Sequence, residues 1–206
     1  APSINSGFGV SVMYDKYGPI NSMGALINYA YHIGIGKNQT LSLGVGAGVQ
    51  MRQYDASGNI YENEDDPLSY YEKDTQIAPD VNFGIQYTLK NWVIGASITH
   101  LQRYFMPKDV RFPSVNYYAY TRYRFELGRY WNIIPSASVH YDNVVVNEEI
   151  NLLVEYTKAI WFGASYRMKD ALAPQAVVPM IGFNISDYVK LGYAYSYNLT
   201  DLNQYN

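Results

Sequence analysis

The sequence has no cysteine, which excludes disulfide bridges, thiolate metal sites and cysteine nucleophiles. It also lacks any apolar run near the ~18 residues of a membrane-spanning helix. Charged residues make up only 16% of its 206 positions, below the roughly 25% of a typical soluble domain. The net charge of −3 gives no basic excess, which argues against a nucleic-acid partner.

The stretch Thr40–Arg52, TLSLGVGAGVQMR, alternates strictly between two kinds of residue. Leucine, valine, alanine and methionine fall on one face, whereas glycine, serine, glutamine and arginine fall on the other. A period of two predicts a β-strand rather than a helix. Its length exceeds the about 9–11 residues with which a tilted strand crosses a bilayer. The stretch therefore predicts a transmembrane strand.

Ten further stretches repeat this alternation. They are Gly7–Tyr14, Met23–Ile33, Val81–Leu89, Trp92–Thr99, Val115–Leu127, Asn132–Tyr141, Ile150–Thr157, Ala159–Met168, Val177–Ile185 and Tyr188–Tyr197. Pro135 and Pro179 interrupt two of them. Because proline cannot donate to a ladder, we expect a bulge or a strand end at each proline.

The connections are expected to alternate in length. Short turns are expected near Gly36–Gln39, Lys90–Asn91, Gly128–Trp131, Thr157–Lys158 and Ser186–Asp187. Long loops are expected at Asp15–Ser22, Asp55–Pro79, Gln102–Ser114, Asp142–Glu149 and Lys169–Ala176. One rim of short turns and one of long loops is typical of outer-membrane barrels, whose short turns face the periplasm.

A soluble barrel with the apolar face inside is the alternative. It would leave glycine, serine, asparagine and glutamine outside, with few of the charges that keep soluble proteins dispersed. The 23 tyrosines also cluster towards strand ends, as in interfacial aromatic girdles. The predicted fold is therefore all-β, a transmembrane antiparallel up-and-down β-barrel in the bacterial outer membrane.

The strand count suggests an incomplete barrel. About 11 strands are visible, whereas single-chain bacterial barrels have an even number, so we expect 12–14 in the complete protein. Residues 1–206 are expected to form a single outer-membrane β-barrel domain, incomplete at both ends. The start, APSINSGFG, lacks the features of a secretory signal, which is expected to have been removed or to lie upstream.

The sequence offers little catalytic chemistry. His32, His100 and His140 are far apart, and no Asp/Glu–His pair has the spacing of a metal or proteolytic motif. A hydrolase using His140 with Ser136 or Ser138 is conceivable, but no motif favours it. We expect no enzyme activity, no catalytic or metal site and no cofactor.

The connection Asp55–Asp74, DASGNIYENEDDPLSYYEKD, is strongly acidic. One interpretation is a Ca²⁺ site using oxygen ligands from Asp55, Asn59, Glu62 or Asp65, although the spacing of a known calcium loop is absent. A solvated extracellular loop is the simpler interpretation, and a docking surface for a partner lies between the two. The residues of such a docking loop would be Asp55, Glu62, Glu64, Asp65, Asp66, Glu72 and Asp74.

Several charges lie on the polar face of the predicted strands, where a barrel would have its lumen. They are Arg52, Arg122, Arg124, Glu126, Glu155, Arg167 and Lys190. Buried charges are costly unless paired, which favours mutual pairing that fills a narrow lumen. A solute path, or a seat for a plug or partner segment, is the alternative role.

An ordered set of short motifs resembles the PorP/SprF family of Bacteroidetes outer-membrane proteins. These motifs are Gly9-Val10-Ser11, Tyr14-Asp15-Lys16-Tyr17-Gly18-Pro19, Tyr29-Ala30-Tyr31, Leu41-Ser42-Leu43-Gly44, Gly46-Ala47-Gly48, Asp66-Pro67, Phe83-Gly84, Val93-Ile94-Gly95-Ala96-Ser97-Ile98, Ile134-Pro135-Ser136, Trp161-Phe162-Gly163-Ala164-Ser165-Tyr166-Arg167 and Leu191-Gly192-Tyr193-Ala194-Tyr195. The resemblance covers nearly the whole chain. Family members usually have further segments before Ala1 and after Asn206, which agrees with the expected missing strands.

The resemblance implies a non-enzymatic role in the type IX secretion system. Some such proteins belong to the core assembly and contact periplasmic lipoproteins of the secretion and gliding motor. Others serve the export or surface attachment of one secreted adhesin, by binding its C-terminal signal domain. The implied partners are that adhesin, the translocon, the lipoproteins and outer-membrane lipid. A passive small-solute channel is the rival hypothesis.

Overall fold

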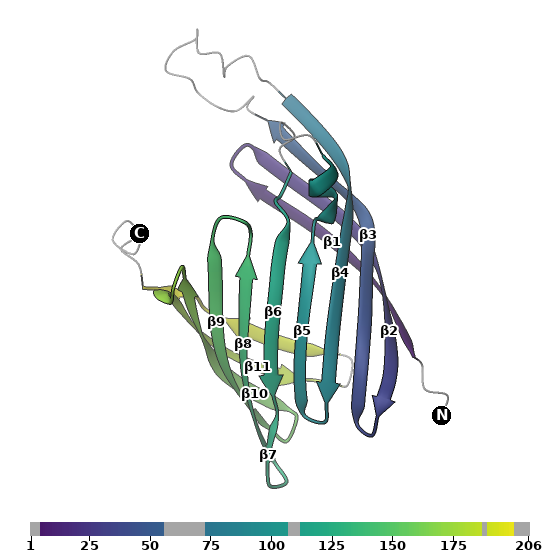
Figure 1. Ribbon diagram of the computed structural model, residues 1–206. Helices are drawn as coiled ribbons and strands as arrows, with labels where there is room; N and C mark the ends of the chain where they lie inside the picture. The colour runs from purple at the N-terminus through teal and green to yellow at the C-terminus, as the bar shows by residue number, and fades with distance from the viewer. Residues whose placement is uncertain (1–4, 56–72, 107–111, 187–188, 200–206) are drawn as a thin grey trace. The chain divides into compact units, whose positions relative to one another are not determined.

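The structure is a computed structural model in which residues 5–55, 73–106, 112–186 and 189–199 are described. Strands dominate these residues, and no α-helix occurs among them (Figure 1). The strands are β1 (Ser6–Tyr17), β2 (Ile20–Gly36), β3 (Gln39–Asp55), β4 (Lys73–Leu89), β5 (Trp92–Thr99), β6 (Asn116–Tyr123), β7 (Phe125–Leu127), β8 (Trp131–Tyr141), β9 (Val146–Tyr156), β10 (Ile160–Lys169), β11 (Ala173–Asn184), β12 (Lys190–Ala194) and β13 (Tyr197–Asn198). A short 3₁₀ helix, η2 (Leu101–Phe105), follows β5. The described part of the chain has no helix long and apolar enough to cross a membrane.

Each strand pairs with its neighbours in the sequence, in the order β1-β2-β3-β4-β5-β6-β8-β9-β10-β11-β12. The short strands β7 and β13 continue the paths of β6 and β12, pairing with β8 and β11. The pairs β1–β2, β6–β8, β7–β8, β8–β9, β9–β10, β10–β11, β11–β12 and β11–β13 are antiparallel. This confirms the predicted all-β, antiparallel, up-and-down fold. Among the described strands, β1 and β12 end the order without pairing with each other, so the sheet is open.

The chain divides into two compact units. The first contains Ala1–Ile33, Ser42–Gly84 and Ile98–Val115. The second contains Gly34–Leu41, Ile85–Ser97 and Asn116–Asn206. The strands β2, β3, β4 and β5 each contribute residues to both units, and every contact described below lies within one unit.

In the first unit, the apolar face of the strands is the exposed one. On β3, Val45 and Val49 are about half exposed, whereas Gln50 between Val49 and Met51 is buried. On β2, exposed Ala25, Ile27 and Tyr29 alternate with less exposed residues. Soluble proteins bury such residues, so this unit has its hydrophobic side outward.

The second unit shows the same inversion. Trp131, Val139 and Tyr141 of β8 are exposed, whereas Asn132 is buried. Aromatic rings cluster near both ends of this strand. At one end, the centroid of the Trp131 ring lies 4.6 Å from that of Tyr156, and at the other the Tyr141 ring stacks on Tyr117 at 6.1 Å. The arrangement agrees with the predicted aromatic girdles.

Three of the five connections expected to be long are short. Two residues join β1 to β2, four join β8 to β9 and three join β10 to β11. The predictions of long loops at Asp15–Ser22, Asp142–Glu149 and Lys169–Ala176 were therefore wrong. Charged residues at strand ends, such as Glu148 and Glu149, pair through their backbones in the ladder like any others. The connections from β3 to β4 and from β5 to β6 are long, as predicted.

Asp142 explains why the β8–β9 connection is tight. Its carboxylate accepts the backbone N–H groups of Val145 and Val144, at 2.8 and 3.0 Å. These bonds favour the ionised form, so they hold the pKa of Asp142 below its ordinary value. An aspartate that bonds backbone groups two and three residues ahead is a common way to close a turn.

Both prolines act on the neighbouring strand rather than on their own. β8 and β11 continue through Pro135 and Pro179 without a bulge at either proline, which corrects the prediction. The pairs Arg122↔Ser136 and Phe125↔Ile133 place Tyr123 opposite Pro135, at the interruption between β6 and β7.

Pro179 has the same effect on the strand beside β11. The pairs Met180↔Ala194 and Val177↔Tyr197 place Tyr195 opposite Pro179, at the break between β12 and β13. The Tyr195 N–H donates to the Pro179 carbonyl at 3.1 Å, but proline has no N–H to return the bond. The missing donor accounts for each interruption.

Glycines on the polar face make room for aromatic rings. A Cβ atom at Gly182 would overlap the Trp161 indole and lie 2.6 Å from the Leu191 carbonyl oxygen. A Cβ at Gly192 would lie 2.7 Å from the same indole. Trp161 of β10 therefore lies over the backbones of β11 and β12, which explains why both positions are glycine.

We predict that Gly182→Ala destabilises the protein by about 1–3 kcal/mol, because the indole must leave its position. The measurement is urea unfolding in detergent micelles, followed by tryptophan fluorescence. Gly34→Ala is the control, since a Cβ there meets nothing within 4 Å. Equal stability of Gly182→Ala and the control would contradict the packing of Trp161 against Gly182.

We also predict that the β8–β9 turn loosens in acid. Because the pKa of Asp142 is lowered, its stabilisation is complete at neutral pH and is lost as pH falls through that lowered pKa. The amide NMR shifts of Val144 and Val145 should report this titration. Asp142→Asn should keep the acceptor and abolish the titration, whereas a midpoint at or above the ordinary aspartate pKa would disprove the assignment.

Candidate functional site

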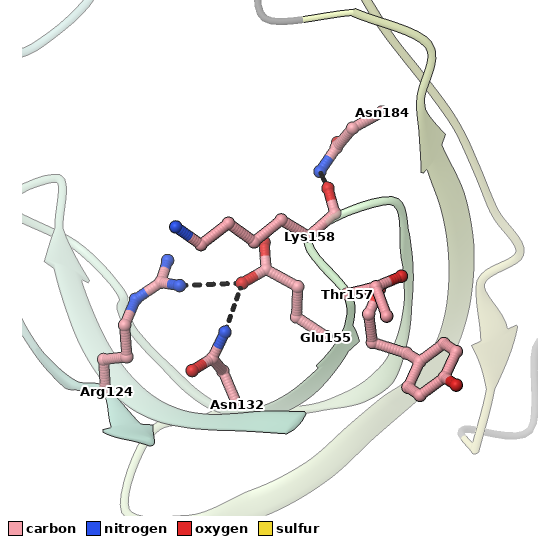
Figure 2. A network of polar contacts seen from close by, with 7 residues as sticks. Arg124, Asn132, Glu155, Thr157, Lys158 and Asn184 are labelled. Atoms are coloured by element: carbon pink, nitrogen blue, oxygen red, sulfur yellow. Dashed lines mark hydrogen bonds and ion pairs between the residues drawn. The ribbon is translucent and has the colours of Figure 1, made fainter. Parts of the chain in front are cut away.

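A charged cluster lies on the polar face of the second unit, beside the turns β7–β8 and β9–β10 (Figure 2). Arg124 Nη1 lies 2.7 Å from Glu155 Oε2, and the Asn132 amide donates to the same oxygen at 2.9 Å. Asn132 and Glu155 are directly opposite each other on β8 and β9. The Glu155 side chain is only 12% exposed, so both donors are needed to stabilise its charge.

Pro135 helps to place Arg124 in this cluster. Arg124 is the residue between β6 and β7, next to Tyr123, which faces the proline. Its backbone N–H instead donates to the Asn91 carbonyl, at 3.0 Å. The interruption of the ladder thus coincides with the arginine that reaches Glu155.

A second ion pair lies nearer the other end of the same strands. Arg167 Nε lies 3.0 Å from Glu149 Oε2, and the two residues are directly opposite on β10 and β9. Both side chains are more exposed than Glu155, at 46% and 30%. Three of the seven polar-face charges predicted as candidates are therefore in ion pairs: Arg124 and Glu155 pair with each other, and Arg167 pairs with Glu149, which was not a candidate.

A cavity of about 830 Å³ adjoins the Arg124–Glu155 pair. Glu126 of β7 and Lys190 of β12, both candidates from the sequence, line it together with residues of three turns. The lining residues are Arg124, Glu126, Gly128, Arg129, Tyr130, Asn132, Glu155, Thr157, Lys158, Asn184, Ser186 and Lys190. Lys158 extends beside the ion pair, and its carbonyl accepts a hydrogen bond from the Asn184 amide (Figure 2).

The two remaining arginine candidates lie elsewhere. Arg122 lines a smaller cavity of about 340 Å³ with Gln86, Ser136 and Asn151. Arg52 belongs to β3 in the first unit. Whether any of the seven charges faces a lumen stays a prediction.

Most of the acidic loop lies outside the described residues. Those positions are Asn59, Glu62, Glu64, Asp65, Asp66 and Glu72. Asp55 ends β3, and its N–H donates to the Pro19 carbonyl at 2.8 Å. Asp74 accepts a hydrogen bond from Gln76 at 3.0 Å. In the described parts of the chain, no group of three or more His, Cys, Asp or Glu residues could hold a metal ion.

The histidines have separate partners. His32 lies 2.8 Å from the Ser42 hydroxyl, and His140 lies 3.1 Å from the Asn116 side-chain oxygen. The His140 ring also stacks on Tyr118, with centroids 4.4 Å apart. These contacts give His140 an amide partner where the hydrolase hypothesis requires a serine.

The sequence analysis missed a buried cluster around His100 in the first unit. The His100 ring lies 3.0 Å from the Asp80 carboxylate. The backbone N–H of His100 donates to the Asn82 side-chain oxygen at 3.0 Å. Gln102, also buried, accepts the Val81 N–H at 3.1 Å. These bonds fix the start of the β5–β6 connection. The signal that could have indicated this cluster is the charge of Asp80, which lies within β4.

The turn residues Arg129 and Lys158 were also missed as cavity residues, because the sequence assigned them only to turns. A signal was available. The turns β2–β3, β4–β5, β7–β8 and β9–β10 each contain one basic residue and no acidic residue, namely Lys37, Lys90, Arg129 and Lys158.

Comparison with known families gives one match. The family described as "Type IX secretion system membrane protein PorP/SprF" matches residues 2–206, which include all the strands and both ion pairs. Comparison with curated proteins gives no match. The family description names a membrane component of a secretion system rather than an enzyme.

We predict that Arg124 and Glu155 are coupled more strongly than Arg167 and Glu149. A double-mutant cycle to alanine should give about 1–3 kcal/mol for the first pair, because Glu155 is largely buried and also bonds Asn132. The second, more exposed pair should give roughly 0–1 kcal/mol and serves as the matched control. Equal coupling energies in chemical unfolding would show that burial does not distinguish the pairs.

Proposed function

The chain belongs to the PorP/SprF family of type IX secretion system membrane proteins, as its motifs predicted, and we propose that it acts as an outer-membrane β-barrel component of that system. In this proposal it binds or anchors a secreted adhesin at the cell surface through the adhesin's C-terminal signal domain. A link between the secretion machinery and periplasmic lipoproteins is its additional or alternative role. Residues 1–206 contribute one domain to this barrel.

The observation that carries the proposal is the exposure of the apolar face. Exposed apolar residues alternate with less exposed polar ones in both units. On β8, Trp131 and Tyr141 are ten residues apart, or ~33 Å at ~3.3 Å per residue. A strand tilt of roughly 40° reduces this to ~25 Å, the height of the apolar band in outer-membrane barrels. Lipid is therefore the expected neighbour of this face.

The loops support the adhesin role over a role in the core assembly. Of the connections that run between described strands, the one from β3 to β4 is the longest and carries the acidic run Asp55–Asp74. Exposed loops on a rigid scaffold are common binding elements. The acidic residues named above as a docking loop are the proposed contact with the adhesin.

The rival function is a passive channel for small solutes. The glycines and arginines of the polar face favour it. Against it, Arg124 and Arg167 are each engaged by a glutamate, so they contribute little free charge to a conduction path. A scaffold needs no open path.

Deletion of the gene should stop one adhesin from reaching the surface while other type IX cargo is still secreted. The reason is that a loop-mediated contact recognises one partner. Surface labelling followed by quantitative proteomics measures both quantities, and complementation with the intact gene is the control.

Loss of all type IX cargo would instead assign the chain to the core assembly. Steady open steps in planar bilayers, with normal adhesin display in the deletion strain, would favour the channel and contradict the proposal.

A further inference from the structure

The turns β2–β3, β4–β5, β7–β8 and β9–β10 form a basic rim at one end of the second unit. Backbone hydrogen bonds join neighbouring turns: Lys90 N–H to the Asn38 carbonyl at 2.8 Å, and Thr157 N–H to the Tyr130 carbonyl at 2.7 Å. These four turns carry Lys37, Lys90, Arg129 and Lys158. The chain as a whole carries −3, so the basic residues are concentrated locally.

The cavity described above opens at this rim and has an excess of positive charge. Among its described lining residues, four are basic (Arg124, Arg129, Lys158 and Lys190) and two are acidic (Glu126 and Glu155). The Arg124–Glu155 pair removes one charge of each sign. Three cations then face one carboxylate. Within the described chain, no ion pair is recorded for Arg129, Lys158 or Lys190.

The cavity lies away from the surface that lipid would contact. Asn132 and Glu155 line it from the polar face, whereas their strand neighbours Trp131 and Tyr156 are on the exposed face of β8 and β9. A lipid headgroup next to the exposed face would meet these aromatic rings. The ligand must therefore approach from the aqueous side of the turns.

The size and chemistry of the cavity fit a peptide better than a single small anion. Its volume lies in the roughly 300–1,000 Å³ range of ligand sites. Besides the cations, amides and hydroxyls line it. A peptide supplies N–H donors and carbonyl acceptors for these groups as well as carboxylates for the cations.

We propose that this cavity binds an acidic peptide segment of a partner protein, with Lys158, Lys190 and Arg129 pairing with its carboxylates. The proposal goes beyond the role in adhesin display. If the short turns face the periplasm, as in the proposed outer-membrane orientation, the partner is periplasmic. The peptide binding itself does not depend on that orientation.

The test uses the full chain in neutral-lipid nanodiscs and a fluorescein-labelled hexaglutamate peptide, with binding measured by anisotropy. The double variant Lys158→Gln/Lys190→Gln should weaken binding at least about tenfold, equivalent to about 1.4 kcal/mol. The control Arg167→Gln/Lys169→Gln removes the same charge at the end of β10 opposite to the turn that carries Lys158, and should change binding less than about twofold, since distant charges are screened. Binding should also weaken with added salt.

Three outcomes would overturn the proposal: no binding to the wild-type chain, equal losses in both double variants, or equal competition by inorganic phosphate. Stronger competition by phosphatidylglycerol vesicles than by unlabelled peptide would also overturn it, in favour of a lipid site. Lys158→Arg/Lys190→Arg should keep most of the affinity, which guards against a folding defect in the glutamine variant. Peptide binding is measured on purified protein, so its failure would leave the proposed role in secretion standing.

Discussion

Backbone pairing is the constraint on which this structure depends. Strands that expose an apolar face to hydrocarbon have no water there to satisfy their N–H and C=O groups, so neighbouring strands must do so. Antiparallel pairing of sequential strands satisfies these groups with tight turns. The side chains of each strand then point alternately to the two faces. The buried residues accordingly include the polar Gln50, Asp80, Asn132 and Ser165. The polar side is where the chain builds its specific contacts.

Those contacts follow from cross-strand register. Asn132 and Glu155 face each other on β8 and β9, and Glu149 and Arg167 do so on β9 and β10. Because directly opposed side chains on one face are close, each pair forms with little rearrangement. The two pairs stabilise the polar face at different depths of burial. Arg129, Lys158 and Lys190, which line the cavity beside the first pair, form no ion pair among the described residues.

The fold was largely predictable because alternation with a period of two is a local property. All eleven predicted stretches correspond to strands or interrupted strands, and the predicted apolar face is the more exposed one on β2 and β3. Loop lengths failed where strand residues were assigned to a loop, as at Glu148 and Glu149, which are paired in the ladder. The partners of Arg124 and His100 were not predictable, since contacts across 31 and 20 residues depend on register and connection geometry. Neither the register nor the geometry of a connection can be deduced from a local sequence pattern.

The prolines give this sheet a mechanical property. Pro135 and Pro179 each remove one donor from the ladder at a fixed row, and the adjoining strand is divided there into a longer and a shorter piece. A ladder that lacks a rung resists bending less than an intact one. The sheet thus loses one ladder hydrogen bond at each of two rows, whose places are set by proline residues rather than by loops. The pieces Phe125–Leu127 and Tyr197–Asn198 can therefore tilt at a smaller elastic cost than the strands beside them.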